Sequence, residues 1–307
     1  MRLVTESITD KIAVEELVKR FEICNLADGK SPKTINWYND ILVSFIRYLK
    51  LSEKQCYLNS YQIDNIRGYI LYLRHKKKFQ GHRYTPAQDS SLSPETVRGH
   101  VRALKVFSSW LFREKYLDTN VLKDLKLPKV PHKIKEPLSS EEIERVLRSI
   151  KKDSPVGFRN YTIILILIDT GLRESELTGI ILGQVNFEVG YIKVMGKGQK
   201  ERIVPIGDFV KMTLLNYIEN YRPQPSCSMD CDRLFLSSYG KPITSNAIKL
   251  MFSRLAKKSG VTRLHAHLCR RTFSINYLLA GGDAFSLRAI LGHSSMTMVN
   301  HYVRFTS

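Results

Sequence analysis

Residues that can carry out phosphoryl transfer are concentrated in four short segments of this 307-residue chain. The segments are Thr170–Leu177, Gly196–Arg202, His267–Thr272 and Leu291–His293, and Tyr302 follows the last of them. A pair of arginines suits a phosphate, because the guanidinium fork matches phosphate geometry and keeps its charge. A lysine ammonium can donate a proton to a leaving oxygen, and a phenol can bond to phosphorus once its proton is removed. The segments therefore indicate covalent phosphoryl-transfer chemistry.

The order and spacing of these residues are more specific than any single segment. Six of them stand in the order Arg173, Lys197, His267, Arg270, His293 and Tyr302. Arg173 and Lys197 are 24 residues apart, and His267 precedes Arg270 by three residues. His293 follows Arg270 by 23 residues, and Tyr302 follows His293 by nine. In this pattern the chain resembles the tyrosine recombinase, or phage integrase, family, in its Xer-like and mobile-element branch. The resemblance covers nearly the whole chain.

The resemblance implies a site-specific DNA recombinase that cuts and rejoins strands through a covalent 3′-phosphotyrosine link. Such an enzyme needs no ATP, because the covalent aryl phosphate keeps the energy of the broken phosphodiester. It also implies no metal and no other cofactor. The expected partner is double-stranded DNA carrying a specific recombination site, on which a homotetramer assembles across two sites. The expected location is the bacterial cytoplasm, at the nucleoid.

The resemblance also assigns roles to the basic residues of the site. Arg173 and Arg270 are expected to hold the scissile phosphate, and Lys197, on a hairpin turn, to act as the general acid. Glu176 lies one helical turn from Arg173, and we expect it to orient that arginine from behind the site. Near the hairpin, two further basic residues are expected to contact DNA phosphates without taking part in the chemistry, namely Lys200 and Arg202.

The remaining roles fall to two histidines and the tyrosine. His267 is expected to accept or relay the proton of Tyr302, and His293 to bond a non-bridging oxygen and help place that tyrosine. His265 and Arg271 flank the third segment, and helical geometry alone leaves them open as alternatives. The spacing to His293 favours His267 and Arg270.

The charge of the chain points to a polyanionic partner. Lysine and arginine number 48 against 29 aspartate and glutamate, a net charge of +19. Nucleic acid is the usual partner for such a field, with a ribosomal or membrane-surface protein as the plainer alternative. The longest apolar run, 161–168, is too short to span a bilayer, and the N-terminus lacks the features of a secretory signal. We therefore expect no association with a membrane.

Cysteine usage favours reduced thiols and no metal site. The five cysteines form no regular framework, which is typical of a cytosolic protein. Cys227 and Cys231 are spaced like half of a zinc site, but no matching second pair follows them.

Composition and periodicity predict a mainly α fold with a small antiparallel β-sheet, divided into two domains. We predict a helical core-binding domain at 1–124, which the resemblance describes as SAM-like. A basic linker with three prolines follows at 125–137, and an α+β catalytic domain occupies 138–307.

The N-terminal domain contains two clear helix starts. Ser31-Pro32 and Ser93-Pro94 each place serine as the N-cap and proline at the first helical position. The second helix carries an apolar stripe for the core and, on another face, a basic stripe of Arg98, Arg102 and Lys105. Given the overall charge, we predict that the basic stripe contacts DNA rather than serving only as a solvated face.

The catalytic domain is predicted to mix helices with one sheet. Ser139 and Glu142 form a capping box, and an apolar helix over 158–170 ends near Gly171. Alternating β-branched residues over 185–206 predict a small antiparallel sheet, and helices follow over 208–220 and 245–259. Three more helices are expected between His267 and Tyr302.

Two other functions stay open on the residues alone. A type IB topoisomerase-like enzyme would relax supercoiled DNA with a similar set of residues. A DNA-binding regulator with an inert site would keep only the charge. The intervals and the short helical first domain favour recombination, and an intact constellation argues against inertness. Only five residues follow Tyr302, where many family members carry another helix, so we expect a simple two-domain recombinase.

Overall fold

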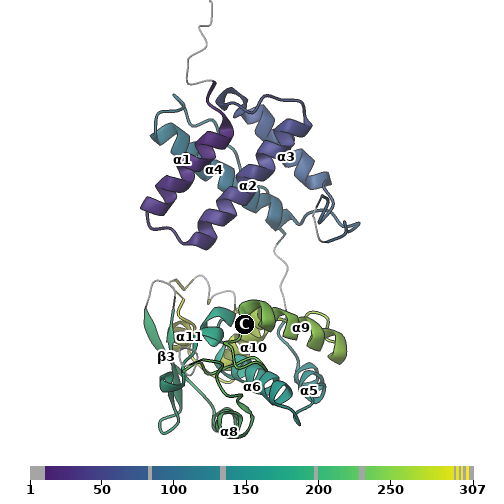
Figure 1. The fold of residues 1–307 in the computed structure, drawn as a ribbon, viewed down its shortest axis with the longest axis vertical. Coiled ribbons are helices and arrows are strands. Elements are labelled where there is room, and N and C mark those ends of the chain that lie inside the picture. Colours follow the sequence, from purple (N-terminus) through teal and green to yellow (C-terminus); the bar gives the residue numbers. More distant parts are fainter. Residues whose placement is uncertain are drawn as a thin grey trace, which may run out of the picture. The chain divides into compact units, whose positions relative to one another are not determined.

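The computed structural model describes residues 11–81, 85–131, 136–196, 200–227 and 232–293, together with 295, 296, 299, 302 and 303. The chain divides into two compact units, Met1–Ile134 and Lys135–Ser307 (Figure 1). This division falls inside the linker predicted for 125–137. Each unit has its own hydrophobic core.

The N-terminal unit is built from helices. They are α1 (Val14–Ala27), α2 (Pro32–Leu51), the 3₁₀ turn η2 (Leu58–Ser60), α3 (Ile63–His75) and α4 (Pro94–Arg113). Their shared core is rich in aromatic rings: Phe21, Phe107 and Trp110 meet with ring centroids 5.3–5.6 Å apart. Rings of this size bury much apolar surface, which lets a small helical unit hold a stable core.

The two predicted helix starts in this unit are confirmed. The Oγ atoms of Ser31 and Ser93 accept hydrogen bonds from the backbone N–H groups of Thr34 and Thr96, at 3.3 Å and 3.2 Å. Each bond satisfies a donor that has no partner inside its helix. The side chain of each cap thereby fixes where α2 and α4 begin.

The C-terminal unit combines helices with one sheet. Its helices are α5 (Ser140–Arg148), α6 (Pro155–Thr170), α7 (Glu174–Gly179), α8 (Asp208–Asn216), α9 (Ser245–Ser259), α10 (Ala266–Leu279) and α11 (Ala284–Leu291), with the short turns η3 (Leu182–Gln184) and η4 (Tyr217–Tyr221). The strands are β1 (Val185–Asn186), β2 (Tyr191–Met195) and β3 (Glu201–Pro205), in the order β1-β2-β3. The predicted fold class, mainly α with a small antiparallel sheet, is confirmed.

The sheet lies at one side of this unit, and α6 packs against α10 in its middle (Figure 1). The inward-facing residues of β2, Ile192 and Val194, are buried and alternate with exposed ones, as a half-buried strand requires. Four apolar residues of α6 are fully buried: Ile163, Ile164, Ile166 and Leu167. The helix that precedes Gly171 is therefore anchored in the core along its length.

Two local details differ from the predicted elements. The helix expected over 208–220 continues from α8 into a π-helical turn, η4, which ends at Tyr221. Helix α7 was not predicted separately, because its six residues are too short to show a periodic pattern. Within the described ranges, none of the helices combines the length and apolarity needed to cross a bilayer.

Candidate active site

The break between α6 and α7 places the first arginine of the site. Gly171 ends α6 in the left-handed conformation, with φ at +62°, which L side chains rarely adopt. A Cβ at this position would also lie 2.5 Å from the ring of Phe273. Glycine is thus required twice, by the backbone and by the close packing of α10. The chain then turns at once, so that Arg173 becomes the N-cap of α7.

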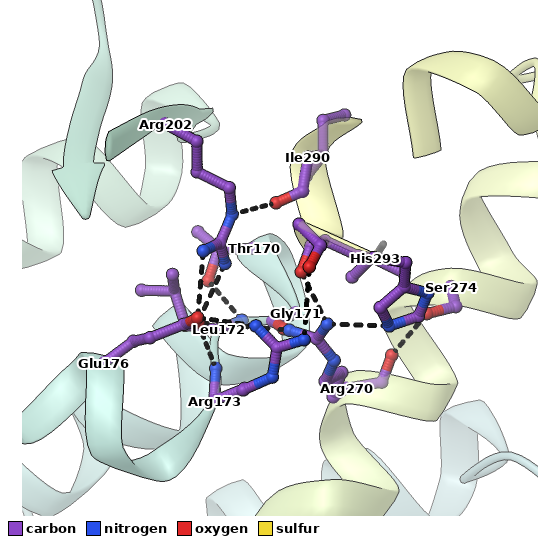
Figure 2. Close-up of polar contacts among 12 residues, drawn as sticks. Thr170, Gly171, Leu172, Arg173, Glu176, Arg202, Arg270, Ser274, Ile290 and His293 are labelled. Carbon is purple, nitrogen blue, oxygen red and sulfur yellow. Dashed lines mark hydrogen bonds and ion pairs between the residues drawn. The ribbon is translucent and has the colours of Figure 1, made fainter. Parts of the chain in front are cut away.

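Glu176 holds Arg173 from behind (Figure 2). Its Oε1 accepts a hydrogen bond from Nη1 of Arg173 at 2.7 Å, and its Oε2 accepts one from the backbone N–H of Arg173 at 2.8 Å. The carboxylate side chain is only 4% exposed, whereas the arginine side chain is 30% exposed. The guanidinium of Arg173 is therefore fixed on its inner side and still open on its outer side.

The carboxyl group of Glu176 is held firmly in its charged form. Burial by itself would raise its pKa, but hydrogen bonds from Arg202 and from Arg173 outweigh burial and lower the pKa to about 2. Glu176 is therefore an anion throughout the neutral range. Its charge offsets part of the repulsion between the arginines gathered around it.

Arg270, on α10, is almost fully buried and is bonded to backbone carbonyls. Its Nη1 donates to the carbonyl oxygen of Gly171 at 2.6 Å, and its Nη2 donates to that of Leu291 at 2.7 Å. Nη1 also lies 4.0 Å from Oε2 of Glu176. Desolvation, and then the charge of Arg173, lower the pKa of Arg270 to about 10, so it remains a cation at neutral pH. The two predicted phosphate-binding arginines are thus brought together.

His293 lies against Arg270 and near the tyrosine. Nη2 of Arg270 is 2.9 Å from Nε2 of His293. Because arginine can only donate, Nε2 accepts, and the proton of the neutral ring sits on Nδ1. Desolvation and the positive charges of Arg270 and Arg173 lower the pKa of His293 to about 4, so the ring is neutral at physiological pH. Its Nδ1 is buried and has no hydrogen-bond partner among the residues that the structure describes.

Tyr302 is half-buried, with its ring centroid 6.4 Å from that of His293 and the two rings inclined by 21°. It packs against a small cluster built on Leu287, Leu291 and Val299. This cluster is formed by α11 and the segment after it. It brings the tyrosine to the same edge of the unit as both arginines.

His267 stands one helical turn before Arg270 on α10 and is exposed. Partial desolvation, and then the charges of Arg270 and His265, lower its pKa. A lowered pKa keeps the imidazole neutral, the state in which it can accept a proton. The alternative His265 is the N-cap of α10, and its Nδ1 lies 2.6 Å from the carbonyl oxygen of Arg263.

Lys197 lies outside the described residues. The described residues on either side are Gly196 and Lys200, and the backbone N–H of the first donates to the carbonyl oxygen of the second at 2.8 Å. The side chain of Lys200 is exposed. The site of the predicted general acid is therefore located only as the segment that joins β2 to β3.

Arg202 lies on the predicted hairpin, but its side chain is bonded inside the protein. Its side chain points inward from β3, is 11% exposed, and bonds Glu176 with both terminal nitrogens, at 2.9 Å and 2.8 Å. Its Nε donates to the carbonyl oxygen of Ile290 at 2.6 Å. All three nitrogens thus have partners inside the protein. This placement differs from the prediction that Arg202 contacts phosphate, because the buried carboxylate is the better partner for a guanidinium fork.

The three basic residues of α4 differ in their surroundings. Arg102 is exposed and Arg98 half-buried, in keeping with a surface stripe. Nζ of Lys105 instead donates to the carbonyl oxygens of Lys123 and Leu125, at 3.0 Å and 2.7 Å. Lys105 therefore secures the segment that follows α4.

Comparisons with known proteins identify the family of this chain. The model of the phage integrase family matches residues 136–307, more than half of the chain. The chain belongs to the phage integrase family. Tyrosine recombinase XerD of Staphylococcus saprophyticus is 31% identical over 290 residues, covering 94% of this chain and 92% of that protein. Tyrosine recombinase XerC of Oceanobacillus iheyensis is 27% identical, covering 93% and 90%.

Solved structures share the fold of this phage integrase family member. The Tn1549 transposon integrase in complex with circular intermediate DNA has a TM-score of 0.74 at 24% identity, covering 95% of each chain. A lambda integrase dimer bound to a COC′ core site has a TM-score of 0.72 at 17% identity, covering 94% and 97%. These structures confirm the predicted fold, while the family model and the relatives named above confirm the predicted family.

In this integrase family member, sequence reasoning missed the backbone acceptors that hold the arginines. The carbonyl oxygens of Gly171 and Leu291 bond Arg270, and that of Gly292 accepts from Nη2 of Arg173 at 3.4 Å. Gly292, like Gly171, ends its helix with a positive φ, here +63°. The sequence offered one signal for these acceptors. Gly171 and Gly292 each stand within two residues of a predicted site residue, at a point where a helix pattern stops.

Proposed function

We propose that this chain is a site-specific DNA recombinase that forms a 3′-phosphotyrosine bond through Tyr302. The observation that carries the proposal is the meeting of Arg173, Arg270 and His293 beside that tyrosine. Two fixed guanidiniums next to a neutral donor and a phenol suit a phosphodiester undergoing in-line attack. The family and the net charge of +19 support DNA as the substrate.

In the cleavage step the phenolic oxygen of Tyr302 attacks phosphorus, and the bond to the 5′-oxygen breaks. The phenolic proton passes to His267, whose lowered pKa keeps it able to accept one. Lys197 donates a proton to the departing 5′-oxygen. A 5′-hydroxyl reverses the same steps to join a strand, so bond energy is conserved and no ATP is needed.

Negative charge grows on the non-bridging oxygens as phosphorus becomes five-coordinate. Arg173 and Arg270 oppose that charge from fixed positions, so little reorganisation is required during the reaction. The Nδ1–H of His293 has no hydrogen-bond partner among the described residues, and we assign it to donate to one of these oxygens. Arg173 and Arg270 together form a phosphate clamp. Each of the two arginines is expected to contribute on the order of 10²–10³ in rate.

The partners follow from the same proposal. We assign double-stranded DNA with a specific site as the substrate and a homotetramer on two such sites as the working assembly. We assign Arg98, Arg102 and Lys200 to contacts with the DNA backbone. The bacterial cytoplasm, at the nucleoid, is the proposed place of action, because the curated relatives named above are bacterial proteins.

The test uses a DNA site recovered by selecting, from a random-sequence duplex pool, the duplexes that the wild-type chain binds. A nicked suicide duplex carrying this site should trap a covalent protein–DNA band with wild type. Tyr302→Phe should bind the duplex and give no band, while the control Tyr277→Phe, in the same apolar cluster, should keep it. A band that persists in Tyr302→Phe would exclude this nucleophile. Plasmid relaxation with no recombinant product would favour a topoisomerase instead.

A further inference from the structure

Arg202 is the side chain that joins three separate parts of the site. It extends from β3, bonds the carboxylate of Glu176 on α7, and bonds the carbonyl of Ile290 near the end of α11 (Figure 2). The carboxylate contact is bidentate, which fixes the carboxylate's orientation as well as its distance. A side chain committed in this way has little capacity left for a DNA phosphate.

The carboxylate of Glu176 is shared between two arginines. Oε1 accepts from Arg173 and Arg202, and Oε2 accepts from the backbone of Arg173 and from Arg202. Arg202 therefore determines the plane in which Glu176 presents its oxygens to Arg173. Any rotation of that carboxylate would move the guanidinium predicted to hold the phosphate.

The contact with Ile290 reaches the other half of the clamp. The two residues after Ile290 supply carbonyl oxygens, that of Leu291 to Arg270 and that of Gly292 to Arg173. His293 follows directly. By holding the carbonyl of Ile290, Arg202 fixes the end of α11, from which these acceptors come.

The surrounding backbone leaves space for this side chain. A Cβ on Gly292 would lie 3.1 Å from Nη1 of Arg202, and a Cβ on Gly196 would lie 3.4 Å from the same nitrogen. Gly196 also closes the base of the segment that contains Lys197, through its bond to Lys200. Arg202 is the second residue of β3, the strand that follows that segment, and its side chain reaches Glu176 behind the phosphate-binding arginines.

We infer that Arg202 is a positioning residue, acting through Glu176 and the end of α11 to set the phosphate clamp and to tie it to the strand that follows the general acid. The inference rests on the proposed function. Without Arg202, Glu176 loses the hydrogen bonds that lower its pKa most, while the burial that raises it remains. Its pKa must therefore rise, and the clamp becomes sensitive to acid.

The experiment measures single-turnover cleavage of the selected suicide duplex at saturating DNA, across pH, well below each variant's melting temperature. Arg202→Met should cleave about 10²-fold more slowly than wild type, because displacing Arg173 weakens one oxyanion-stabilising group. The acid limb of its pH profile should move to higher pH than that of wild type, because Glu176 then titrates at a higher pH. Arg202→Lys, which keeps the charge but not the fork, should lie between the two and serves if Arg202→Met does not fold.

A matched control is Lys193→Met on the neighbouring strand. Lys193 is exposed and pairs with Glu201 at 3.8 Å, so its loss removes one positive charge from the hairpin without touching Glu176. Its cleavage rate and acid limb should match those of wild type. A similar loss in both variants would mean that net charge matters and that the position of Arg202 does not, which overturns the inference.

Two further readouts separate positioning from DNA contact. Because Arg202 works partly through Glu176, the double variant Arg202→Met/Glu176→Gln should lose clearly less activity than the product of the two single losses, since coupled residues are not additive. The salt dependence of DNA binding should be unchanged in Arg202→Met. A slope flattened by about one unit, with normal cleavage at saturation, would make Arg202 a phosphate contact and overturn the inference. A wild type that forms no covalent product would instead refute the proposed function itself.

Discussion

Two groups of basic residues in this molecule lie in opposite physical settings. In the C-terminal unit, Arg270 and Arg202 are buried and bonded to a carboxylate or to backbone carbonyls. In the N-terminal unit, on α4, Arg102 is exposed and Arg98 is half-buried. Both groups are arginine-rich and both were predicted to bind phosphate. The difference lies in what holds each side chain before any DNA arrives.

An arginine that the protein already holds in place is expected to affect the reaction rate, whereas one that is not held is expected to affect DNA binding. The buried arginines have their orientation set by protein acceptors in a region of low dielectric, where interactions are strong and poorly screened. Their expected contribution is to the transition state. Arg98 and Arg102 lie at the surface of α4, where salt screens charges, so their expected contribution is to DNA affinity through counterion release. The predictions below test this division.

The largest effect is expected for Arg270→Ala. Cleavage of the suicide duplex should fall by about 10²–10³, because one arm of the phosphate clamp is lost. The matched control is Arg159→Ala, which removes another arginine of the same unit whose Nη1 bonds a backbone carbonyl, that of Leu236, at 2.8 Å. Both variants should lose stability, and only the first should lose activity at saturating DNA. If both variants lost activity equally, the loss would come from removing an internally bonded arginine and not from removing a phosphate contact.

The next effect concerns the stability of the buried network. The pKa of Glu176 is about 2 in the folded chain, against an ordinary value of 4.5, so folding is favoured by its ionised form. This stabilisation, about 3 kcal/mol, is fully present above pH ~4.5 and is lost as pH falls towards 2. The free energy of unfolding of Glu176→Gln should therefore differ from wild type most near neutrality, and the difference should shrink in acid.

Denaturant unfolding of both chains between pH 6 and pH 3 would measure this difference. The control is Glu144→Gln, whose exposed pair with Arg148 is expected to contribute less than about 1 kcal/mol at any of these values. A Glu176→Gln difference that does not change with pH would contradict the assigned ionised state.

The smallest effect is expected on α4. Arg98→Ala and Arg102→Ala should each reduce the salt dependence of DNA binding by about one unit of slope. Lys105→Ala should leave the slope unchanged, because its ammonium already bonds the carbonyls of Lys123 and Leu125. It should lower thermal stability instead. The slope is measured by DNA titrations at several salt concentrations. A flattened slope for Lys105→Ala would mean that Lys105 does contact DNA phosphate.

Local signals made much of the fold predictable. The serine-proline starts of α2 and α4 and the capping box at Ser139 act within a few residues, so the sequence shows them directly. The sheet followed from its alternating pattern. The internal hydrogen bonds of Lys105 and Arg202 were not predicted, for the opposite reason. Their acceptors lie 18 or more residues away, and no local pattern reports a distant carbonyl or carboxylate.

The candidate site divides in the same way. The choice of Arg173, Arg270, His293 and Tyr302 followed from the family resemblance that their order and spacing carry, and the structure brings them together. The backbone groups that hold these side chains in place could not be predicted. Carbonyl oxygens are common to every residue, so the acceptors of Gly171 and Leu291 are visible only once the helices are packed.

The most direct test of the central claim is the chemical identity of the covalent link. Wild-type protein trapped on the selected suicide duplex would be digested with protease and nuclease, and the nucleotide-bearing peptide identified by mass spectrometry. The expected result is a nucleotide joined through its 3′-phosphate to Tyr302. A nucleotide carried by any other residue, or joined through a 5′-phosphate, would contradict the proposed reaction.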